Sequence, residues 1–120
     1  MTYQEIVMTV REGFENADAR RIFEHLAVQC DIVGEGAGSF YIEVADRMAT
    51  VEPYDYVDRD GKLIADGQTL IDLAMNRLSW RDAIESGKLK WEGNKEKLKL
   101  LVEIKLKKPS KKSTKSSENK

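Results

Sequence analysis

The chain has 120 residues, of which 41% are hydrophobic, and a formal net charge of −1. This length suits one domain with a sizeable core, and no run of about 18 apolar residues exists that could form a membrane-spanning helix. Residues 105–120 hold seven lysines and one glutamate, which leaves residues 1–104 with a net charge of −7. This negative charge argues against nucleic-acid binding by residues 1–104. The chain does not open on a basic segment followed by an apolar one, and Cys30 is its single cysteine. Both features favour a reducing cytoplasm.

Two amphipathic helices are expected first. In residues 2–14, five apolar side chains recur at helical spacing and form one stripe: Tyr3, Ile6, Val7, Val10 and Phe14. Thr2 or Tyr3 starts this helix, and Gly13 weakens its end. Asn16 can cap a second helix. Its apolar face would hold Ala19, Ile22, Phe23 and Leu26.

The period then changes to two, which predicts strands. The apolar positions alternate in four segments: 28–32, 40–44, 49–51 and 63–65. The third segment can run on through Pro53 to Val57, and proline there indicates an edge or a bulge. Asp60-Gly61 is a strong hairpin signal. Four strands in succession with short connections predict an antiparallel meander.

Helical patterns return in the second half of the chain. Thr69-x-x-Asp72 and Ser79-x-x-Asp82 each fit a helix-start box, with aspartate in place of glutamate. Gly87 ends the second of these helices, because glycine tolerates a left-handed conformation. Leu89 and Trp91 then alternate with charged residues in a fifth strand.

Asn94 caps the last helix, whose apolar face carries Leu98, Leu101 and Val102 and which runs to Ile104. The order ααββββααβα predicts an α+β fold. A five-stranded, mostly antiparallel sheet has one face covered by about five helices. We expect residues 1–104 to form this domain and residues 105–120 to form a disordered tail rich in lysine and serine.

A catalytic or metal-binding constellation is not evident. His25, the single histidine, falls on the predicted second helix and has no partner at a recognisable spacing. Cys30 alternates with buried positions and is interpreted as a small core residue. Gly34-x-Gly36-x-Gly38 lacks the spacing of a dinucleotide loop. Asp58-x-Asp60-Gly61 lacks the key carboxylates of a calcium loop. We therefore predict no catalytic residue, metal or cofactor.

Four segments resemble the sterol carrier protein 2 (SCP2) family, and most closely its small, stand-alone bacterial members. These segments are Phe40-Tyr41-Ile42-Glu43-Val44, Val51-Glu52-Pro53-Tyr54, Ala65-Asp66-Gly67-Gln68-Thr69-Leu70 and Ser86-Gly87-Lys88-Leu89-Lys90-Trp91-Glu92-Gly93-Asn94. The resemblance covers roughly residues 1–104 and is most specific at 87–94. It implies an apolar cavity between the sheet and the helices. It also implies non-enzymatic binding of sterols, fatty acids, fatty acyl-CoA or phospholipids.

The candidate lipid-binding wall consists of apolar residues on the inward faces of the strands and of the later helices. It comprises Phe40, Ile42, Val44, Val51, Leu70, Leu73, Ala74, Leu78, Trp80, Ile84, Leu89, Trp91, Leu98 and Leu101. Ordinary core packing explains each position as well as ligand contact does, because a filled core and a lined cavity both join apolar faces. The chain departs from the family pattern at residues 83–86 and at the bulky Trp91. An inward Trp91 would narrow the cavity.

Three functions stay open on the sequence. The first is binding or transfer of an apolar lipid. The second is an accessory module with a filled core that serves a partner enzyme. The third is an acyl-thioester hydrolase, which ranks last because His25 has no evident partner. The lysine-rich tail is interpreted as a solubilising end, with transient contact to an anionic membrane or to RNA as the alternative. No specific nucleic acid is expected, and the oligomeric state is not predicted.

Overall fold

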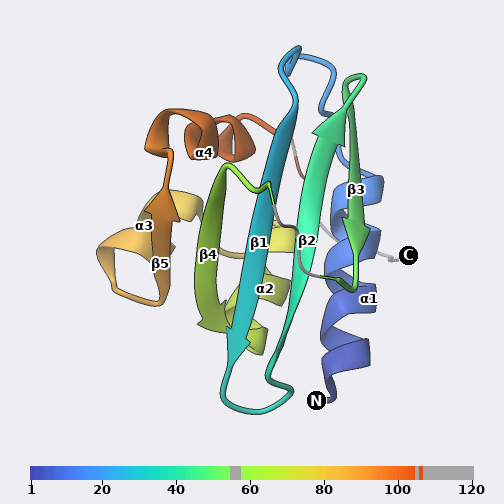
Figure 1. Cartoon of the computed structure of the whole chain (residues 1–120). Helices are drawn as coiled ribbons and strands as arrows, with labels where there is room; N and C mark the ends of the chain where they lie inside the picture. The colour runs from blue at the N-terminus through green and yellow to red at the C-terminus, as the bar shows by residue number, and fades with distance from the viewer. Residues whose placement is uncertain (55–57, 105, 107–120) are drawn as a thin grey trace, which may run out of the picture.

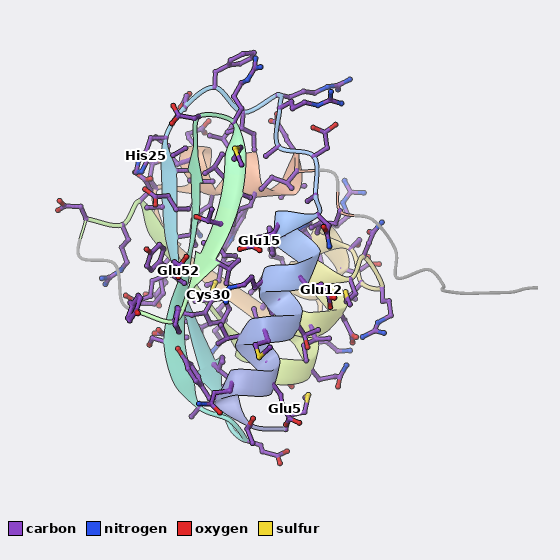
Figure 2. The ribbon with its side chains drawn as sticks, turned by 90° about the vertical axis from the view of Figure 1, so that its right-hand side faces the viewer. Glu5, Glu12, Glu15, His25, Cys30 and Glu52 are labelled. Carbon is purple, nitrogen blue, oxygen red and sulfur yellow. The ribbon has the colours of Figure 1, made fainter. Side chains whose placement is uncertain are left out.

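The computed structural model describes residues 1–54, 58–104 and 106. Over these residues, helices cover one face of a five-stranded sheet (Figures 1 and 2), which confirms the predicted α+β fold. In chain order the elements are α1 (Tyr3–Glu15), β1 (Leu26–Val33), β2 (Gly38–Ala45), β3 (Met48–Glu52), β4 (Gly61–Asp66), α2 (Gly67–Ala74), α3 (Trp80–Glu85), β5 (Leu89–Gly93) and α4 (Lys95–Val102). Four helices are present in this part of the chain, one fewer than expected. None of them is long and apolar enough to span a membrane.

The strands lie in the order β3-β2-β1-β4-β5. Neighbours are antiparallel except β1 and β4, which run parallel. The predicted meander is therefore correct for β1 to β3 and wrong for β4. The chain leaves β3 at one edge and returns beside β1, because a parallel neighbour requires a crossover rather than a hairpin. Asp60-Gly61 starts β4 instead of forming a hairpin turn.

The core lies between the sheet and the helices. Along β2, Phe40, Ile42 and Val44 are buried, while the residues between them are half-buried. Helix α1 packs against β3 and α2, and helix α4 packs against β1, β4 and β5. Strand β5 joins the same sheet, as predicted, and it pairs antiparallel with β4. Strand β3 ends at Glu52, so it does not continue through Pro53, and residues 55–57 of the predicted extension lie outside the described residues.

The predicted second helix is wrong. Residues 16–25 form an irregular segment, and β1 already begins at Leu26. The carboxylate of Asp18 accepts a hydrogen bond from the backbone N–H of Arg20 at 3.0 Å, a local bond of the kind that competes with helix formation. Ile22 is buried, but Phe23 is 78% exposed. The apolar residues of this segment therefore do not share one buried face.

Side-chain caps define the other helix starts. Thr2 forms a capping box with Glu5 at the start of α1, and Ser79 and Asn94 cap α3 and α4 as predicted. The start of α2 differs from the prediction, because Asp66 rather than Thr69 is its N-cap. The predicted tail, residues 105–120, lies outside the described residues except for Leu106.

The cap of α2 makes a pH-dependent contribution to stability. The hydroxyl and the backbone N–H of Thr69 donate to the Asp66 carboxylate, the latter at 2.8 Å, and hold the pKa of Asp66 below its usual value. A lowered pKa in the folded state stabilises the fold above the unfolded pKa of about 3.9, and this contribution is lost as the pH falls through the folded pKa. We expect Asp66→Ala to lower the free energy of unfolding by about 1 kcal/mol at pH 7.

Urea denaturation across the pH range measures this contribution. Asp66→Asn is the matched control, because asparagine keeps the capping oxygen but does not titrate in this range. The difference between wild type and Asp66→Ala should shrink below about pH 4. A difference that stays constant down to pH 2 would contradict a role for the ionised cap.

Candidate functional site

The predicted lipid-binding wall divides into two groups in the structure. Ten of its residues belong to the buried core: Phe40, Ile42, Val44, Val51, Leu70, Leu73, Ala74, Leu89, Leu98 and Leu101. The other four are only partly buried and pack around that core: Leu78, Trp80, Ile84 and Trp91. The second group is the part of the predicted wall that solvent can reach.

A mainly apolar pocket of about 660 Å³, open to solvent, lies between α2, α3 and the end of α4. Three predicted residues, Leu73, Leu78 and Trp80, form part of its wall. The sequence interpretation did not assign its other lining residues, which are Asn76, Ser79, Arg81, Val102, Ile104 and Leu106. We call it the α2–α4 pocket. It is the candidate ligand site.

The α2–α3 connection is held in place by polar contacts. The backbone N–H of Leu78 donates to the carbonyl of Asp72 at 3.2 Å, and the guanidinium of Arg77 lies 3.1 Å from the Asp72 carboxylate. Asn76 adopts a left-handed conformation with φ 60°. Its amide donates to the carbonyl of Leu106 at 3.1 Å. This bond brings the segment after α4 against the pocket.

The walls of the pocket are mainly aromatic and aliphatic, Asn76 and Ser79 add polar groups, and Arg81 is its one charged lining residue. The Trp80 ring meets Phe14 edge-to-face, with 6.5 Å between the ring centroids. Arg81 lies 3.8 Å from Glu85, and both side chains are well exposed. An exposed pair of this kind contributes little to stability. The guanidinium of Arg81 is therefore available to an anionic group at the rim.

Trp91 does not line this pocket. It lies on the covered side of the sheet, opposite Leu63 on the neighbouring strand. Its side chain is half-buried, and the ammonium of Lys95 lies 5.7 Å from the centroid of its ring. Trp91 therefore packs at the β5 edge of the sheet, where it does not narrow the α2–α4 pocket.

His25 has a partner that the sequence spacing does not indicate. Its Nε2 lies 2.6 Å from Oε2 of Glu43, because the pairing of β1 with β2 places Ala27 opposite Glu43. His25 precedes β1 rather than lying on a helix, and it sits on the sheet side of the molecule (Figure 2). The expectation of an unpartnered histidine is therefore wrong. The pair does not line the α2–α4 pocket.

The environments of one thiol and one carboxylate on the sheet fix their protonation states. Cys30 is fully buried, as predicted, and burial raises the pKa of its thiol. Burial also raises the pKa of Asp31, but hydrogen bonds from Gln29, Ser39 and the nearby Lys62 ammonium outweigh it, and the net pKa is lowered. The thiol is therefore protonated at neutral pH and Asp31 is ionised. The thiol is thus a poor nucleophile, and the Asp31 carboxylate is a poor general acid.

The sequence matches the model of a known protein family over most of its length. The model of the SCP-2 sterol transfer family matches residues 10–105. The chain belongs to the SCP-2 sterol transfer family. The resemblance inferred from the sequence is thus confirmed. A comparison with curated proteins finds no match.

Solved structures share the SCP-2 fold. The UbiJ-SCP2 ubiquinone synthesis protein has a TM-score of 0.62 and 19% identity, covering 84% of this chain and 90% of its own. Sterol carrier protein 2 from Aedes aegypti, in complex with the C16 fatty acid palmitate, has a TM-score of 0.57 and 18% identity, covering 86% and 93%. The sec-alkylsulfatase Pisa1 from Pseudomonas sp. has a TM-score of 0.58 and 14% identity over 92% of this chain. This chain spans only 15% of that enzyme.

Proposed function

We propose that this SCP-2 family protein binds and transfers an apolar lipid without catalysing a reaction. The observation that carries the proposal is the α2–α4 pocket, whose volume of about 660 Å³ falls within the range of about 300–1,000 Å³ typical of small-molecule sites. Each buried methylene contributes about 0.8 kcal/mol. Ten buried methylenes would therefore supply about 8 kcal/mol, from which the cost of lost translational and rotational freedom is subtracted. Few polar contacts are required.

The candidate ligands share an apolar chain or ring system: a sterol, a fatty acid, a fatty acyl-CoA or a phospholipid. The apolar part would pack on Leu73, Trp80 and Ile104, which line the pocket. A carboxylate or phosphate, where the ligand has one, would lie near Arg81 at the rim. The palmitate complex of the Aedes aegypti protein supports a fatty acid as the first ligand to test.

Val102 provides a sharp test of the site. It lines the α2–α4 pocket and is 47% exposed, so Val102→Lys places an ammonium in the wall without unfolding the core. We expect palmitate affinity to fall at least about tenfold, because the ligand chain would lose apolar contact and meet a charge. Displacement of a fluorescent fatty acid by palmitate, with native mass spectrometry of the complex, measures the effect.

Val33 is the matched control, since it is also 47% exposed but lies at the end of β1, outside the pocket lining. Val33→Lys should leave palmitate affinity unchanged. Equal losses in the two variants would show that the lipid binds elsewhere. No displaceable probe at micromolar concentration in the wild type would reject lipid binding itself.

An accessory role is the second candidate. It is supported by the burial of ten predicted wall residues in the core, as a module with a filled interior would require. Such a module would bind no palmitate and would instead co-purify with one stoichiometric enzyme. Palmitate titration and native mass spectrometry thus separate the two candidates.

We also infer that the lysine-rich residues 105–120 assist contact with anionic membranes. Seven lysines there outnumber one glutamate, and each basic residue near an anionic surface contributes about 1 kcal/mol. This contribution falls with salt.

A further inference from the structure

Two surface segments meet at one end of the molecule. They are the connection from α1 to β1, residues 16–25, and the turn between β2 and β3, residues 45–48 (Figure 1). The guanidinium carbon of Arg47 lies 5.3 Å from the centroid of the Phe23 ring, which joins the two segments by a cation–π contact. We call the surface formed by Arg20, Arg21, Phe23, Arg47 and Met48 the Phe23 end.

The Phe23 end exposes large apolar side chains. Phe23 is 78% exposed and Met48 is 67% exposed. Asp46 and Arg47 both have positive φ, 52° and 64°, as in the tight turns that connect hairpin strands. This turn fixes the positions of Arg47 and Met48 at the tip of a regular strand pair. The two apolar side chains are thus presented on ordered backbone.

The two segments that carry the Phe23 end, residues 16–25 and 45–48, differ in net charge from the rest of residues 1–104. Within the described residues, Arg21 and Arg47 form no ion pair, whereas Arg20 binds the Asp18 carboxylate at 3.0 Å. Residues 16–25 and 45–48 also contain Glu24 and Asp46, and together they are neutral. The −7 charge of residues 1–104 therefore lies outside them. This end can approach an anionic surface without the repulsion that the remaining body would meet.

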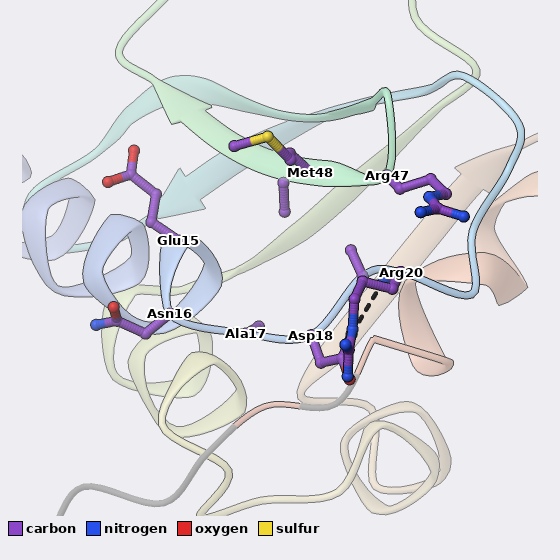
Figure 3. A pocket seen from close by; sticks show the side chains of 9 residues that line it. Glu15, Asn16, Ala17, Asp18, Arg20, Arg47 and Met48 are labelled. Atoms are coloured by element: carbon purple, nitrogen blue, oxygen red, sulfur yellow. Dashed lines mark hydrogen bonds and ion pairs between the residues drawn. The ribbon is translucent and has the colours of Figure 1, made fainter.

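A second pocket lies directly beside these side chains. It has a volume of about 460 Å³ and lies between residues 15–20 and residues 47–49. Figure 3 shows Arg20 and Arg47 on facing walls at one side of this pocket, Met48 above it, and Glu15 at the opposite side. Asp18 also lines this pocket and binds the Arg20 guanidinium, so Arg47 is the guanidinium that is available to a phosphate attached to an apolar chain.

We propose that the Phe23 end is a docking surface for anionic phospholipid bilayers. Phe23 and Met48 enter the interface between headgroups and acyl chains, where aromatic and other amphipathic side chains are favoured. Arg21 and Arg47 contact lipid phosphates, and the neighbouring pocket admits a headgroup. This surface is separate from the α2–α4 pocket, and the inference does not depend on the proposed lipid cargo.

Flotation of the full-length chain with vesicles tests the proposal. We expect binding to vesicles of phosphatidylcholine mixed with phosphatidylglycerol, weaker binding to phosphatidylcholine alone, and release at high salt. Phe23→Ser should weaken binding to the mixed vesicles about tenfold, because it removes a membrane-buried ring. Arg47→Gln should weaken it about fivefold.

Two substitutions serve as matched controls. Met8→Ser removes a side chain that is 66% exposed on α1, and Lys90→Gln removes one exposed positive charge from β5. Neither should change vesicle binding by more than about twofold, since neither residue lies at the Phe23 end. All four side chains are exposed, and circular dichroism verifies that the variants fold.

Two results would overturn the proposal. If Phe23→Ser and Arg47→Gln bind mixed vesicles as tightly as the wild type, the lysine-rich tail alone makes the contact. If wild type binds no vesicle but retains an acidic protein partner through Phe23, the surface is a protein interface. Palmitate binding in the α2–α4 pocket is expected to be unchanged in Phe23→Ser, so the two proposals fail separately.

Discussion

Gly13→Ala should destabilise the fold by about 3 kcal/mol, although alanine is intrinsically the better helix former. A Cβ atom at Gly13 would lie 2.4 Å from the carbonyl oxygen of Ala74 and 2.9 Å from its carbonyl carbon. These are backbone atoms at the end of α2, and no side-chain rotation can move them away. Overpacking of this kind costs about 1–3 kcal/mol, and contact with rigid backbone places Gly13 at the upper end.

Urea denaturation of Gly13→Ala measures this cost. Gly87→Ala is the control for a glycine substitution without a clash, since Gly87 has φ 81° and a Cβ atom there would meet no group of the described residues within 4 Å. Its left-handed conformation alone should cost about 1–2 kcal/mol. A Gly13→Ala protein as stable as the wild type would mean that α1 and α2 can separate at little cost. Because Leu73, beside Ala74, lines the α2–α4 pocket, separation would also alter ligand affinity.

Gly13 illustrates what a single sequence reveals about a helix. Its apolar spacing predicted α1 correctly, and Gly13 was interpreted as a weak helix end. In the structure Gly13 is a buried position inside α1, where α2 approaches. The period of the side chains is a local property and predicts the element. The close approach of α1 and α2 joins Gly13 to Ala74, which is 61 residues further along the chain. No local sequence pattern encodes such a contact.

For the strands too, local features were predictable and contacts between distant segments were not. Alternation of apolar residues located β1 and β2, and the caps Ser79 and Asn94 located the starts of α3 and α4, because each of these signals acts within a few residues. The parallel pairing of β1 with β4 was not predicted. The pairing depends on the chain returning to the edge of β1 that β2 does not occupy. The alternation of apolar residues and the Asp60-Gly61 signal fit a hairpin equally well.

The candidate site was predicted only in part, for a related reason. Leu73, Leu78 and Trp80 were identified as apolar wall residues, and they do line the α2–α4 pocket. The sequence pattern places Ile104 at the end of the domain and Leu106 in the tail. Their apolar side chains among lysines were the available signal, and the bond from Asn76 to Leu106 shows why they matter. The register of β1 and β2 also brings Glu43 to His25. Nothing in the sequence near either residue indicates this contact.

Asp60→Ala should lower the free energy of unfolding by about 2–3 kcal/mol. The Asp60 N–H donates to the carbonyl of Ala27 at 2.7 Å, and the Ala27 N–H donates back to Oδ2 of Asp60 at 2.8 Å. Ala27 is fully buried. The substitution leaves its N–H without an acceptor, and an unsatisfied buried donor costs about 1–3 kcal/mol. The ammonium of Lys97 would lose its 3.7 Å ion pair with Oδ1 of Asp60 and keep its hydrogen bond to the carbonyl of His25.

This reciprocal pair fixes the start of the two parallel strands and so determines the register of the sheet. Asp60→Asn keeps an acceptor oxygen for the Ala27 N–H and should cost about 1 kcal/mol or less. Asp58→Ala changes a neighbouring exposed carboxylate and should stay within about 0.5 kcal/mol of the wild type. Urea denaturation at neutral pH ranks the three variants. Equal losses in Asp60→Ala and Asp60→Asn would assign the stabilisation to the negative charge facing Lys97 rather than to the hydrogen bond that joins β1 and β4.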